Sequence, residues 1–368
     1  MKYRIPVVLL CVCGGCADSD STTSQPPAET RSVEQLQPSP DNVEAVAALE
    51  ALGAEFKRND NGNITEVNLR DTPATDDALQ HVAALEKVAS VLLNDLPITD
   101  DGLAHLAEWK APVGNLDLRG CSVGNDGLAY LKSLKSLKAI RLNGTSGATT
   151  VDDGGLQHLV DLTNLKVLAL DGLWVSEVGL ESLDRLVNLE ELYLKSTTIS
   201  DEGLRLLARY PKLKKLRLAF NQISDAGLAH LSGITTLQEL DLSENAQIFD
   251  TGLEHLSALT NLKKLNLWRV AVSDAGVQKL APLTNLEWLN LDNTQLSDDG
   301  LPALKYMTKL TFLHLGSTTV SDAGLVNLAG LTTLRALKVT RTAVTEEGVA
   351  ALQFKLPDTN IQLLYIAP

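Results

Sequence analysis

Cysteine is scarce in this sequence and unevenly placed. Of the four cysteines in 368 residues, Cys11, Cys13 and Cys16 fall at the N-terminus, which leaves Cys121 alone in the rest of the chain. A single cysteine forms no disulfide framework and no pair of Cys-x-x-Cys metal motifs. The sequence therefore excludes a small fold held together by disulfides and a structural zinc site built from cysteines.

Aromatic and basic residues are also few. Phe, Trp and Tyr make up 4% of the chain while apolar residues make up 44%, so the core must be aliphatic and mostly leucine. The formal net charge is −14 and the isoelectric point is about 4.9. Phosphate contacts need a basic surface, so this charge argues against a nucleic-acid partner and favours a body that resists non-specific association.

Motifs of catalysis are missing as well. The sequence has no nucleophile elbow, no Gly-rich phosphate loop and no His-Glu-x-x-His. We therefore expect no enzyme activity, no cofactor and no metal ion. One catalytic alternative stays open, in which Asp241 with Glu239 or Glu244 forms the acid and base of a glycan hydrolase.

The N-terminus has the pattern of an export signal. Lys2 and Arg4 precede an apolar run, residues 5–12, that is too short to span a bilayer. The sequence Cys-Gly-Gly-Cys at residues 13–16 resembles the lipobox of bacterial lipoproteins, which implies that Cys16 is acylated and becomes the mature N-terminus. Ordinary signal cleavage after Ala17 is the alternative, and would give a secreted or periplasmic protein.

Residues 17–40 are rich in Ser, Thr, Pro and Gln and poor in large apolar side chains. Such a segment cannot bury enough surface to offset the entropy lost on ordering. We expect a disordered tether between the signal segment, residues 1–16, and the folded part of the chain. Together the two segments predict an exported protein anchored to the cell envelope by lipid alone.

The rest of the chain is a repeat with the pattern L-x-x-L-x-L. Successive copies are spaced by 24 or 25 residues, with one spacing of 28 between Leu142 and Leu170. This period predicts twelve repeats over residues 64–356. The last apolar residues of the twelve strands are Leu69, Leu93, Leu118, Leu142, Leu170, Leu194, Leu218, Leu242, Leu267, Leu291, Leu315 and Val339.

The repeat resembles the leucine-rich repeat family over about residues 64–364. Its Ser/Thr-Asp-x-Gly-Leu-x-x-Leu segment, as in Ser224 to Leu231, looks most like the repeats of F-box-associated and bacterial GALA-type proteins. The resemblance implies an α/β fold, a right-handed solenoid in the form of a horseshoe, with a parallel concave β-sheet and short helices on the convex side.

Elementary geometry explains the residue types that recur in each repeat. Alternation along a strand places Leu216 and Leu218 in the core and Lys215 and Arg217 outside. Short polar residues in the next turn are expected to hydrogen-bond the turn's own backbone. Ser224 then caps a helix, Asp225 adds a favourable charge to its first turn, and Gly227 is expected to let the helix approach the strand. The turn residues are Thr72, Thr145, Thr197, Asn221, Asn245, Thr294, Thr318 and Thr342.

The ends of the repeat array need caps. Residues 41–52 read as a helix, with Asp41 and Glu44 spaced as a capping box and Gly53 as the stop. A hairpin turning at Asn61-Gly62 then leads into the first repeat. We expect residues 41–63 to form the N-terminal cap and residues 357–368 to add a closing strand.

The outward strand positions are where the repeat varies. Trp, Tyr and Phe total 15 in the chain, and five of them are predicted on this face between the sixth and eleventh repeats. Exposed aromatic and arginine side chains on a rigid surface are typical of interface hot spots. The predicted ligand-binding residues are Tyr193, Arg217, Phe220, Trp268, Arg269, Trp288, Phe312 and His314.

Three other features are weaker candidates. A histidine column includes His230 and His255 on successive repeats, but metal sites need three or four ligands, so inheritance of the repeat unit explains it better. An aspartate column is explained by helix capping rather than by calcium. The longer loop, Asn143 to Gly155, is a candidate for a secondary contact at the rim.

These observations predict a non-catalytic recognition module, monomeric and tethered to the envelope, that binds a protein or a glycan on its concave sheet. A ubiquitin-ligase substrate adaptor is the alternative that the repeat resemblance suggests, although an export signal and a tether occupy the place of the F-box. The glycan hydrolase named above is the third hypothesis.

Overall fold

The structure, a computed structural model, describes residues 40–364. The signal segment with Cys16, the tether up to residue 39 and the last four residues lie outside the described residues, so those predictions stay predictions. Within residues 40–364, which form one compact unit, no helix has the length and apolar character needed to cross a bilayer.

Fourteen strands form one sheet in chain order, each hydrogen-bonded to its neighbours in the sequence. β1 pairs with β2 antiparallel, through the predicted hairpin, and every later pair is parallel. Most strands are only three residues long. They are β1 (Glu55–Arg58), β2 (Ile64–Asn68), β3 (Ser90–Leu92), β4 (Asn115–Asp117), β5 (Ala139–Asn143), β6 (Val167–Asp171), β7 (Glu191–Tyr193), β8 (Lys215–Arg217), β9 (Glu239–Asp241), β10 (Lys264–Asn266), β11 (Trp288–Asn290), β12 (Phe312–His314), β13 (Ala336–Lys338) and β14 (Asn360–Gln362).

A short helix follows nearly every strand, and several end in or consist of a 3₁₀ turn. The α-helices are α1 (Val43–Ala51), α2 (Asp77–Ala83), α3 (Asp100–Ala104), α4 (Asn125–Tyr130), α5 (Asp153–Leu156), α6 (Glu177–Glu181), α7 (Asp201–Leu206), α8 (Asp225–Leu231), α9 (Asp250–Leu253), α10 (Asp274–Lys279), α11 (Asp322–Leu325) and α12 (Glu346–Lys355). The 3₁₀ helices are η1 (Leu131–Ser133), η2 (Gln157–Leu159), η3 (Leu207–Arg209), η4 (Glu254–Leu256), η5 (Asp298–Tyr306) and η6 (Val326–Leu328).

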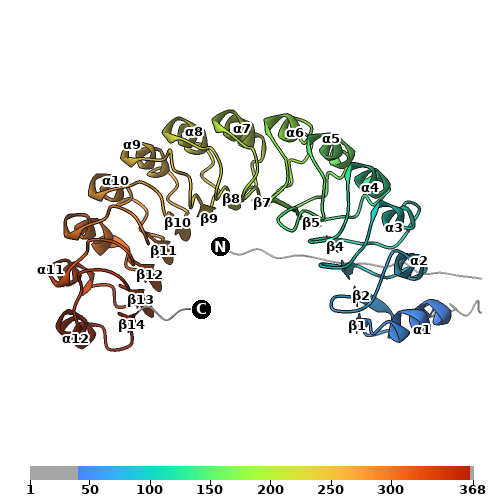
Figure 1. The fold of residues 1–368 in the computed structure, drawn as a ribbon, viewed down its shortest axis with the longest axis horizontal. Helices are drawn as coiled ribbons and strands as arrows, with labels where there is room; N and C mark the ends of the chain where they lie inside the picture. Colours follow the sequence, from blue (N-terminus) through green and yellow to red (C-terminus); the bar gives the residue numbers. More distant parts are fainter. Residues whose placement is uncertain (1–39, 365–368) are drawn as a thin grey trace, which may run out of the picture. The chain divides into compact units, whose positions relative to one another are not determined.

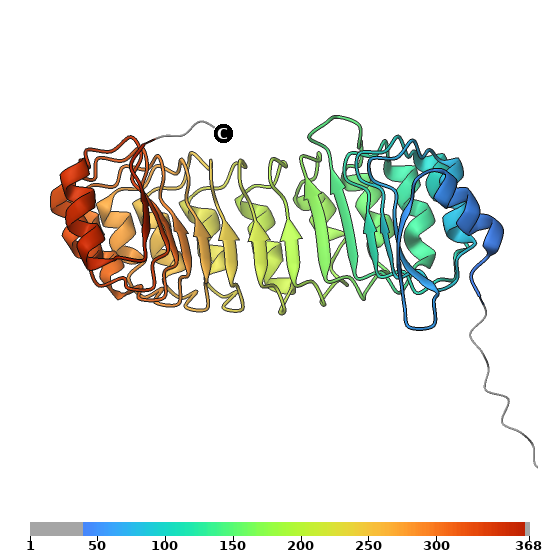
Figure 2. The same cartoon turned by 90° about the horizontal axis from the view of Figure 1, so that it is seen from below.

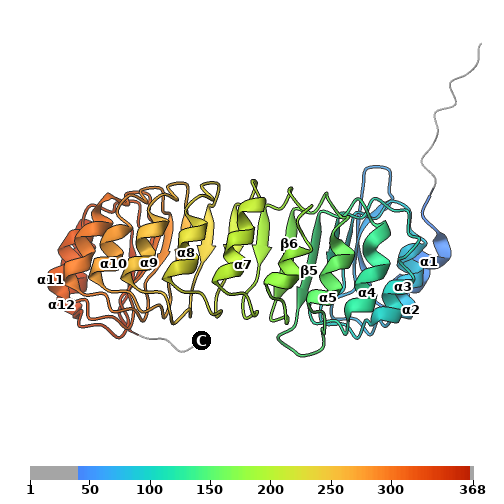
Figure 3. The same ribbon diagram turned by 90° about the horizontal axis from the view of Figure 1, so that it is seen from above.

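Residues 40–364 curve into an arc, with the strands on its inner side and the helices on its outer side (Figure 1). Seen from below, the molecule presents its sheet to the viewer (Figure 2). Seen from above, it presents its helices (Figure 3). Strands pair about 4.8 Å apart, whereas packed helices need about 8–10 Å, so the stack must bend toward the sheet. The predicted α/β leucine-rich solenoid with an open parallel sheet is confirmed.

The core is a continuous aliphatic stack between the sheet and the helices. All twelve repeat anchors from Leu69 to Val339 are fully buried. Leu216 and Leu218 lie inside while Lys215 and Arg217 stay accessible, as strand alternation predicts. Cys121 is buried too; its thiol donates to the Leu93 carbonyl oxygen at 3.2 Å, and burial raises the pKa of that thiol to about 12.

The aspartate column links neighbouring repeats. Ser224 caps α8 as predicted, accepting from the Ala226 amide at 3.2 Å. Its own amide and hydroxyl donate to the two carboxylate oxygens of Asp201, one repeat earlier, at 2.8 and 2.5 Å. The same pair of bonds recurs with closely similar distances in other repeats. The prediction that helix capping alone explains the column is therefore wrong. The recurring pairs include Ser176–Asp153, Ser273–Asp250, Ser297–Asp274, Ser321–Asp298 and Thr345–Asp322.

The glycine of the motif makes room for this link. A Cβ atom at Gly227 would collide with the Asp201 carboxylate, and one at Gly252 would collide with Asp225. The expected role of Gly227, allowing helix and strand to approach, is thus corrected. What approaches the glycine is the aspartate of the preceding repeat. Ser, Asp and Gly form one unit that spans two repeats.

The polar turn residues behave as predicted in most repeats. The Thr197 hydroxyl donates to the Leu194 carbonyl oxygen at 2.9 Å, and the Asn221 amide reaches the carbonyl oxygens of both Leu194 and Leu218. Thr145 differs because it begins the inserted loop, where its amide donates to the Asn143 side chain instead. The turns are thereby satisfied from within the stack.

The N-terminal helix is capped one residue later than predicted. Asn42, not Asp41, accepts from the Ala45 amide at 3.0 Å. The Asp41 carboxylate instead accepts from the Ile64 amide at 2.7 Å and so ties the helix to the hairpin. Gly53 ends the helix with φ of 88°, as expected for a stop residue.

Candidate functional site

The outward side chains of β7 to β12 form two rows across the concave sheet. The strands pair in register without a shift, so side chains about 24 residues apart in sequence become neighbours. The first row is Glu191, Lys215, Glu239, Lys264, Trp288 and Phe312. The second row is Tyr193, Arg217, Asp241, Asn266, Asn290 and His314.

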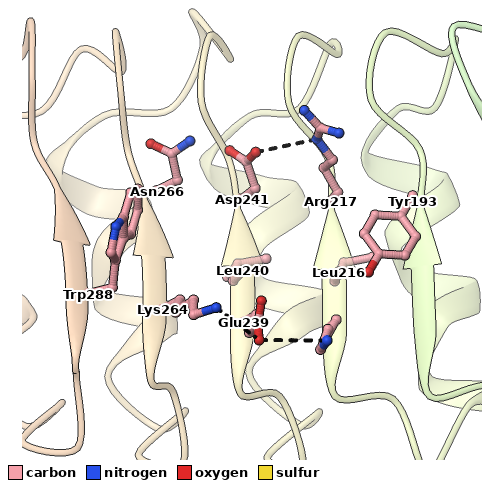
Figure 4. A pocket seen from close by; sticks show the side chains of 10 residues that line it. Tyr193, Leu216, Arg217, Glu239, Leu240, Asp241, Lys264, Asn266 and Trp288 are labelled. Atoms are coloured by element: carbon pink, nitrogen blue, oxygen red, sulfur yellow. Dashed lines mark ion pairs between the residues drawn. The ribbon is translucent and has the colours of Figure 1, made fainter. Parts of the chain in front are cut away.

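Charges alternate along the first row and pair with one another. The Lys215 Nζ lies 3.0 Å from Glu191 Oε1 and 3.8 Å from Glu239 Oε1. The Lys264 Nζ approaches the same Glu239 oxygen at 3.4 Å (Figure 4). The hydrogen bond to Glu191 raises the pKa of Lys215. Cations and anions therefore compensate each other before any partner arrives.

The second row is organised around Arg217. Its guanidinium lies 3.0 Å from Asp171. On the other side it lies 3.5 Å from Asp241 (Figure 4). Burial raises the pKa of Asp171, partly offset by its bonds to the Lys195 amide and to Arg217. The Tyr193 hydroxyl donates to Glu191 at 2.7 Å, and burial together with that bond raises the pKa of Tyr193. The phenol is thus held neutral, in one orientation.

A groove of about 390 Å³ runs across this part of the sheet (Figure 4). Tyr193 stands at one end of it and Trp288 at the other, and the charged side chains of both rows lie between them. The buried Leu216 and Leu240 also line it. The groove combines two aromatic walls, a small apolar floor and compensated charges.

Beyond Trp288 the sheet carries an aromatic cluster. The rings of Trp288 and Phe312 stack with centroids 5.0 Å apart and an interplanar angle of 6°. His314 meets Phe312 edge-on at 6.3 Å, and the Lys338 ammonium lies 5.8 Å from the Phe312 ring. Burial lowers the pKa of His314, against the opposing effect of Asp292. The imidazole is therefore mostly neutral at pH 7.

Three predicted residues lie elsewhere. Phe220, Trp268 and Arg269 were expected on outward strand positions, but β8 ends at Arg217 and β10 at Asn266. The chain then turns through a left-handed residue, with φ of 55° at Phe220 and 56° at Arg269. These residues therefore lie just beyond the strand ends, at the edge of the sheet. Tyr193, Arg217, Trp288, Phe312 and His314 do share the concave face.

One prominent exposed residue was not predicted from the sequence. Trp174 lies in the turn after β6 and is 78% exposed, the highest value for a tryptophan in the described chain. Its turn position carries Gln222 two repeats later, so no outward-strand pattern marks it. The available signal was a large aromatic ring in a turn position that elsewhere holds smaller or polar residues, such as Ser122, Gln222 and Ala343.

The histidine column stays a set of separate side chains. His230 is exposed and His255 half-buried on the helical side. Within residues 40–364, no three His, Cys, Asp or Glu side chains gather as a metal site would require. The aspartates are engaged in the bonds between repeats described above.

Comparisons with known proteins agree with this architecture. A family model described as "Leucine Rich repeat" matches residues 186–208, 211–232, 233–257 and 306–329. A crystal structure of an internalin from Listeria monocytogenes is similar over 88% of this chain and 94% of its own, with a TM-score of 0.61 and 21% identity. The curated proteins give no match to the sequence.

A crystal structure of a TDR receptor is similar as well. It aligns with 80% of this chain at a TM-score of 0.53 and 18% identity, and this chain covers 50% of the receptor chain. At these identities the likeness concerns the fold. Taken with the matched repeats, it supports a leucine-rich repeat fold, a curved stack that presents an extended concave surface.

Proposed function

We propose that this protein is a non-catalytic recognition module that binds a protein partner on its concave sheet, with Trp288 and Phe312 at the centre of the contact. The stacked pair carries the proposal because it places a large apolar surface, held rigid by the sheet, beside a polar groove. Hot spots of protein interfaces combine buried aromatic anchors with a surrounding polar rim.

The compensated charges favour selectivity over general attraction. Glu191, Lys215, Glu239 and Lys264 alternate at the spacing of the strands, about 4.8 Å. A partner that replaces these ion pairs must carry complementary charges in the same alternating order and at the same spacing. Otherwise a charge is left unpaired. This arrangement suits a folded protein surface or an extended strand better than a mobile polyelectrolyte.

The catalytic alternative is less well supported. Glu239 pairs with Lys264, Asp241 with Arg217, and Glu244 with Arg269 at 3.1 Å. A glycan hydrolase needs two carboxyl groups that face each other across the scissile bond. Each carboxylate here faces a cation instead, so recognition accounts for the surface with fewer assumptions.

The proposal includes lipid anchoring at Cys16, which rests on the Cys-Gly-Gly-Cys pattern after an apolar run. Anchored there and followed by a polar tether, a monomeric repeat domain would be displayed at the cell envelope. Expression in a bacterium fed a clickable fatty acid tests this. The wild-type chain should incorporate the label and the Cys16→Ser chain should not. Equal labelling of the two, or none in either, would exclude this anchor.

The binding face is tested by removing its aromatic pair. Full-length protein and its Trp288→Ala/Phe312→Ala variant are each immobilised and exposed to an envelope extract of the source cell, and retained proteins are quantified by mass spectrometry. We expect at least one protein retained by the wild type to fall tenfold or more on the variant. Retention that is unchanged would contradict the proposal.

A matched control separates this effect from general loss of exposed aromatic surface. Tyr306 is 57% exposed and Phe354 is 83% exposed, and both lie on the helical side of the repeats. The Tyr306→Ala/Phe354→Ala variant should retain the partner as the wild type does. If both double variants lose it equally, the concave face has no special role.

A further inference from the structure

We propose a second ligand site, independent of the concave groove, at the edge of the sheet between Trp174 and Phe220, and we infer that its ligand is a neutral carbohydrate. The site is formed mainly by the turns that follow β6, β7 and β8, and Glu244 from the turn after β9 completes it. It goes beyond the recognition function proposed above and uses none of the same aromatic residues.

A cleft of about 360 Å³ lies between these three turns. Trp174 is 78% exposed and Phe220 is 58% exposed, and both line the cleft. Its volume falls in the range of small-molecule sites. Two large aromatic side chains beside one cleft, with most of their surface open to solvent, form a binding feature rather than part of the core.

The backbone presents Phe220 in an unfavourable conformation. One turn position is left-handed in nearly every repeat, and in five repeats it holds Gly, Asp or Asn, which tolerate this conformation, as at Asp71, Gly172 and Asn293. Three consecutive repeats depart from the rule with Phe220, Glu244 and Arg269, and the last repeat does so with Arg341. Bulky side chains kept at left-handed positions point to a use for those side chains at the surface.

The inserted loop lies along one side of the cleft. The Gly144 amide donates to the Asp171 carbonyl oxygen at 2.9 Å, and a Cβ atom at Gly172 would collide with Thr145. Gly172 itself lines the cleft. The loop projects at this edge, next to β5 and β6 (Figure 3). The single long repeat in the chain is therefore placed where it borders the site.

The polar groups of the cleft suit a ligand rich in hydroxyls. Ser196 and Gln222 line it, and within residues 40–364 no hydrogen bond engages their side chains. Glu244 also lines it, held at 3.1 Å by Arg269, whose guanidinium lies over the Trp268 ring. The hydroxyl groups of a ligand both donate and accept hydrogen bonds. They can therefore pair with the Ser196 hydroxyl, the Gln222 amide and the Glu244 carboxylate.

The charge of the cleft and its exposed aromatic surface select the ligand class. Among the described residues that line the cleft there is an acid, Glu244, but no Lys or Arg, which disfavours phosphate and other anions. The electron-rich face of an indole attracts the polarised C–H groups on the face of a sugar ring. A neutral oligosaccharide fits both conditions, stacked on Trp174 and hydrogen-bonded to the polar groups between the two rings.

The test uses full-length protein on an array of neutral, N-acetylated and anionic oligosaccharides, with lysine-rich peptides printed beside them. We expect binding to a neutral or N-acetylated oligosaccharide, reduced at least tenfold in Trp174→Ala and less in Trp174→Phe, which keeps an aromatic face. The Trp288→Ala/Phe312→Ala variant should bind the sugar as the wild type does. Thermal unfolding of each variant shows that the fold is intact.

Three outcomes would overturn the inference. They are no binding to any neutral sugar, sugar binding that survives Trp174→Ala, and a preference for the anionic sugars or the lysine peptides. Loss of sugar binding in the Trp288→Ala/Phe312→Ala variant would move the site to the concave groove. The pair Trp174 and Phe220 is separate from the pair Trp288 and Phe312. A negative result for sugar binding at the edge therefore does not decide whether the concave face binds a protein.

Discussion

Most glycines of the repeat motif face the aspartate of the preceding repeat. At Gly227 the space that a Cβ would take is occupied by the Asp201 carboxylate, which accepts two hydrogen bonds from Ser224. A side chain there must either displace the carboxylate or push the two repeats apart. The motif is therefore a contact between repeats, and its three residues act as a unit.

Replacing Gly227 by alanine should lower the free energy of unfolding by about 1–3 kcal/mol, the usual cost of overpacking. Gly233→Ala is the control, because an added Cβ there meets nothing within 4 Å, and it should stay within about 0.5 kcal/mol of the wild type. Urea unfolding measures both. Equal effects of the two substitutions would contradict the collision.

A double-mutant cycle tests the partner directly. Asp201→Ala loses the bonds to Ser224 but also removes the group that Gly227→Ala strikes. The two substitutions together should therefore cost less than the sum of their separate effects. Strict additivity would mean that the carboxylate is not what the glycine accommodates.

At the scale of the strands, paired charges join neighbouring repeats at the edge where each strand begins. Glu190 precedes β7 and lies 2.7 Å from Lys166 and 2.6 Å from Lys214, which precede β6 and β8. Hydrogen bonds from these two lysines lower the pKa of Glu190 to about 2 from its ordinary 4.5. One carboxylate thus bridges three consecutive repeats, although all three side chains remain open to solvent screening.

This bridge should give part of the stability a defined pH dependence. A carboxylate whose pKa is lower in the folded state contributes fully above its unfolded pKa, near 4.5, and loses that contribution as the pH falls through about 2. Glu190→Gln should therefore be less stable than the wild type at pH 7, with the difference shrinking toward pH 2 and at 1 M salt. Thermal unfolding from pH 7 to 2 measures it. A difference independent of pH would contradict the ionic origin.

The sequence predicts the strands correctly where the alternation of apolar and polar residues alone decides which side chains face the core. Leu216 inside and Arg217 outside follow from the two-residue period of a strand. The end of a strand is set differently, by a turn that passes through a left-handed residue, and no apolar pattern marks that point. For this reason Phe220, Trp268 and Arg269 were assigned to the face although they lie at its edge. The helix cap at Asn42 was missed because Asp41 offers an equally suitable side chain.

At the scale of the whole molecule, the solenoid turns sequence period into spatial adjacency. Trp288 and Phe312 stack because β11 and β12 pair in register, so residues 24 positions apart share one row. The concave part of the candidate site was predictable for this reason. Trp174 was not, since the cleft it shares with Phe220 joins two different turn positions across three repeats.

Site-directed photocrosslinking can show whether the concave sheet is the binding face, as we propose. A photoreactive phenylalanine replaces Asn266, which lines the groove between Asp241 and Trp288, or Gln278, on α10 at the opposite side of the same repeat. We expect the partner to crosslink from position 266 and not from position 278. Crosslinking from 278 alone, or equally from both positions, would contradict it.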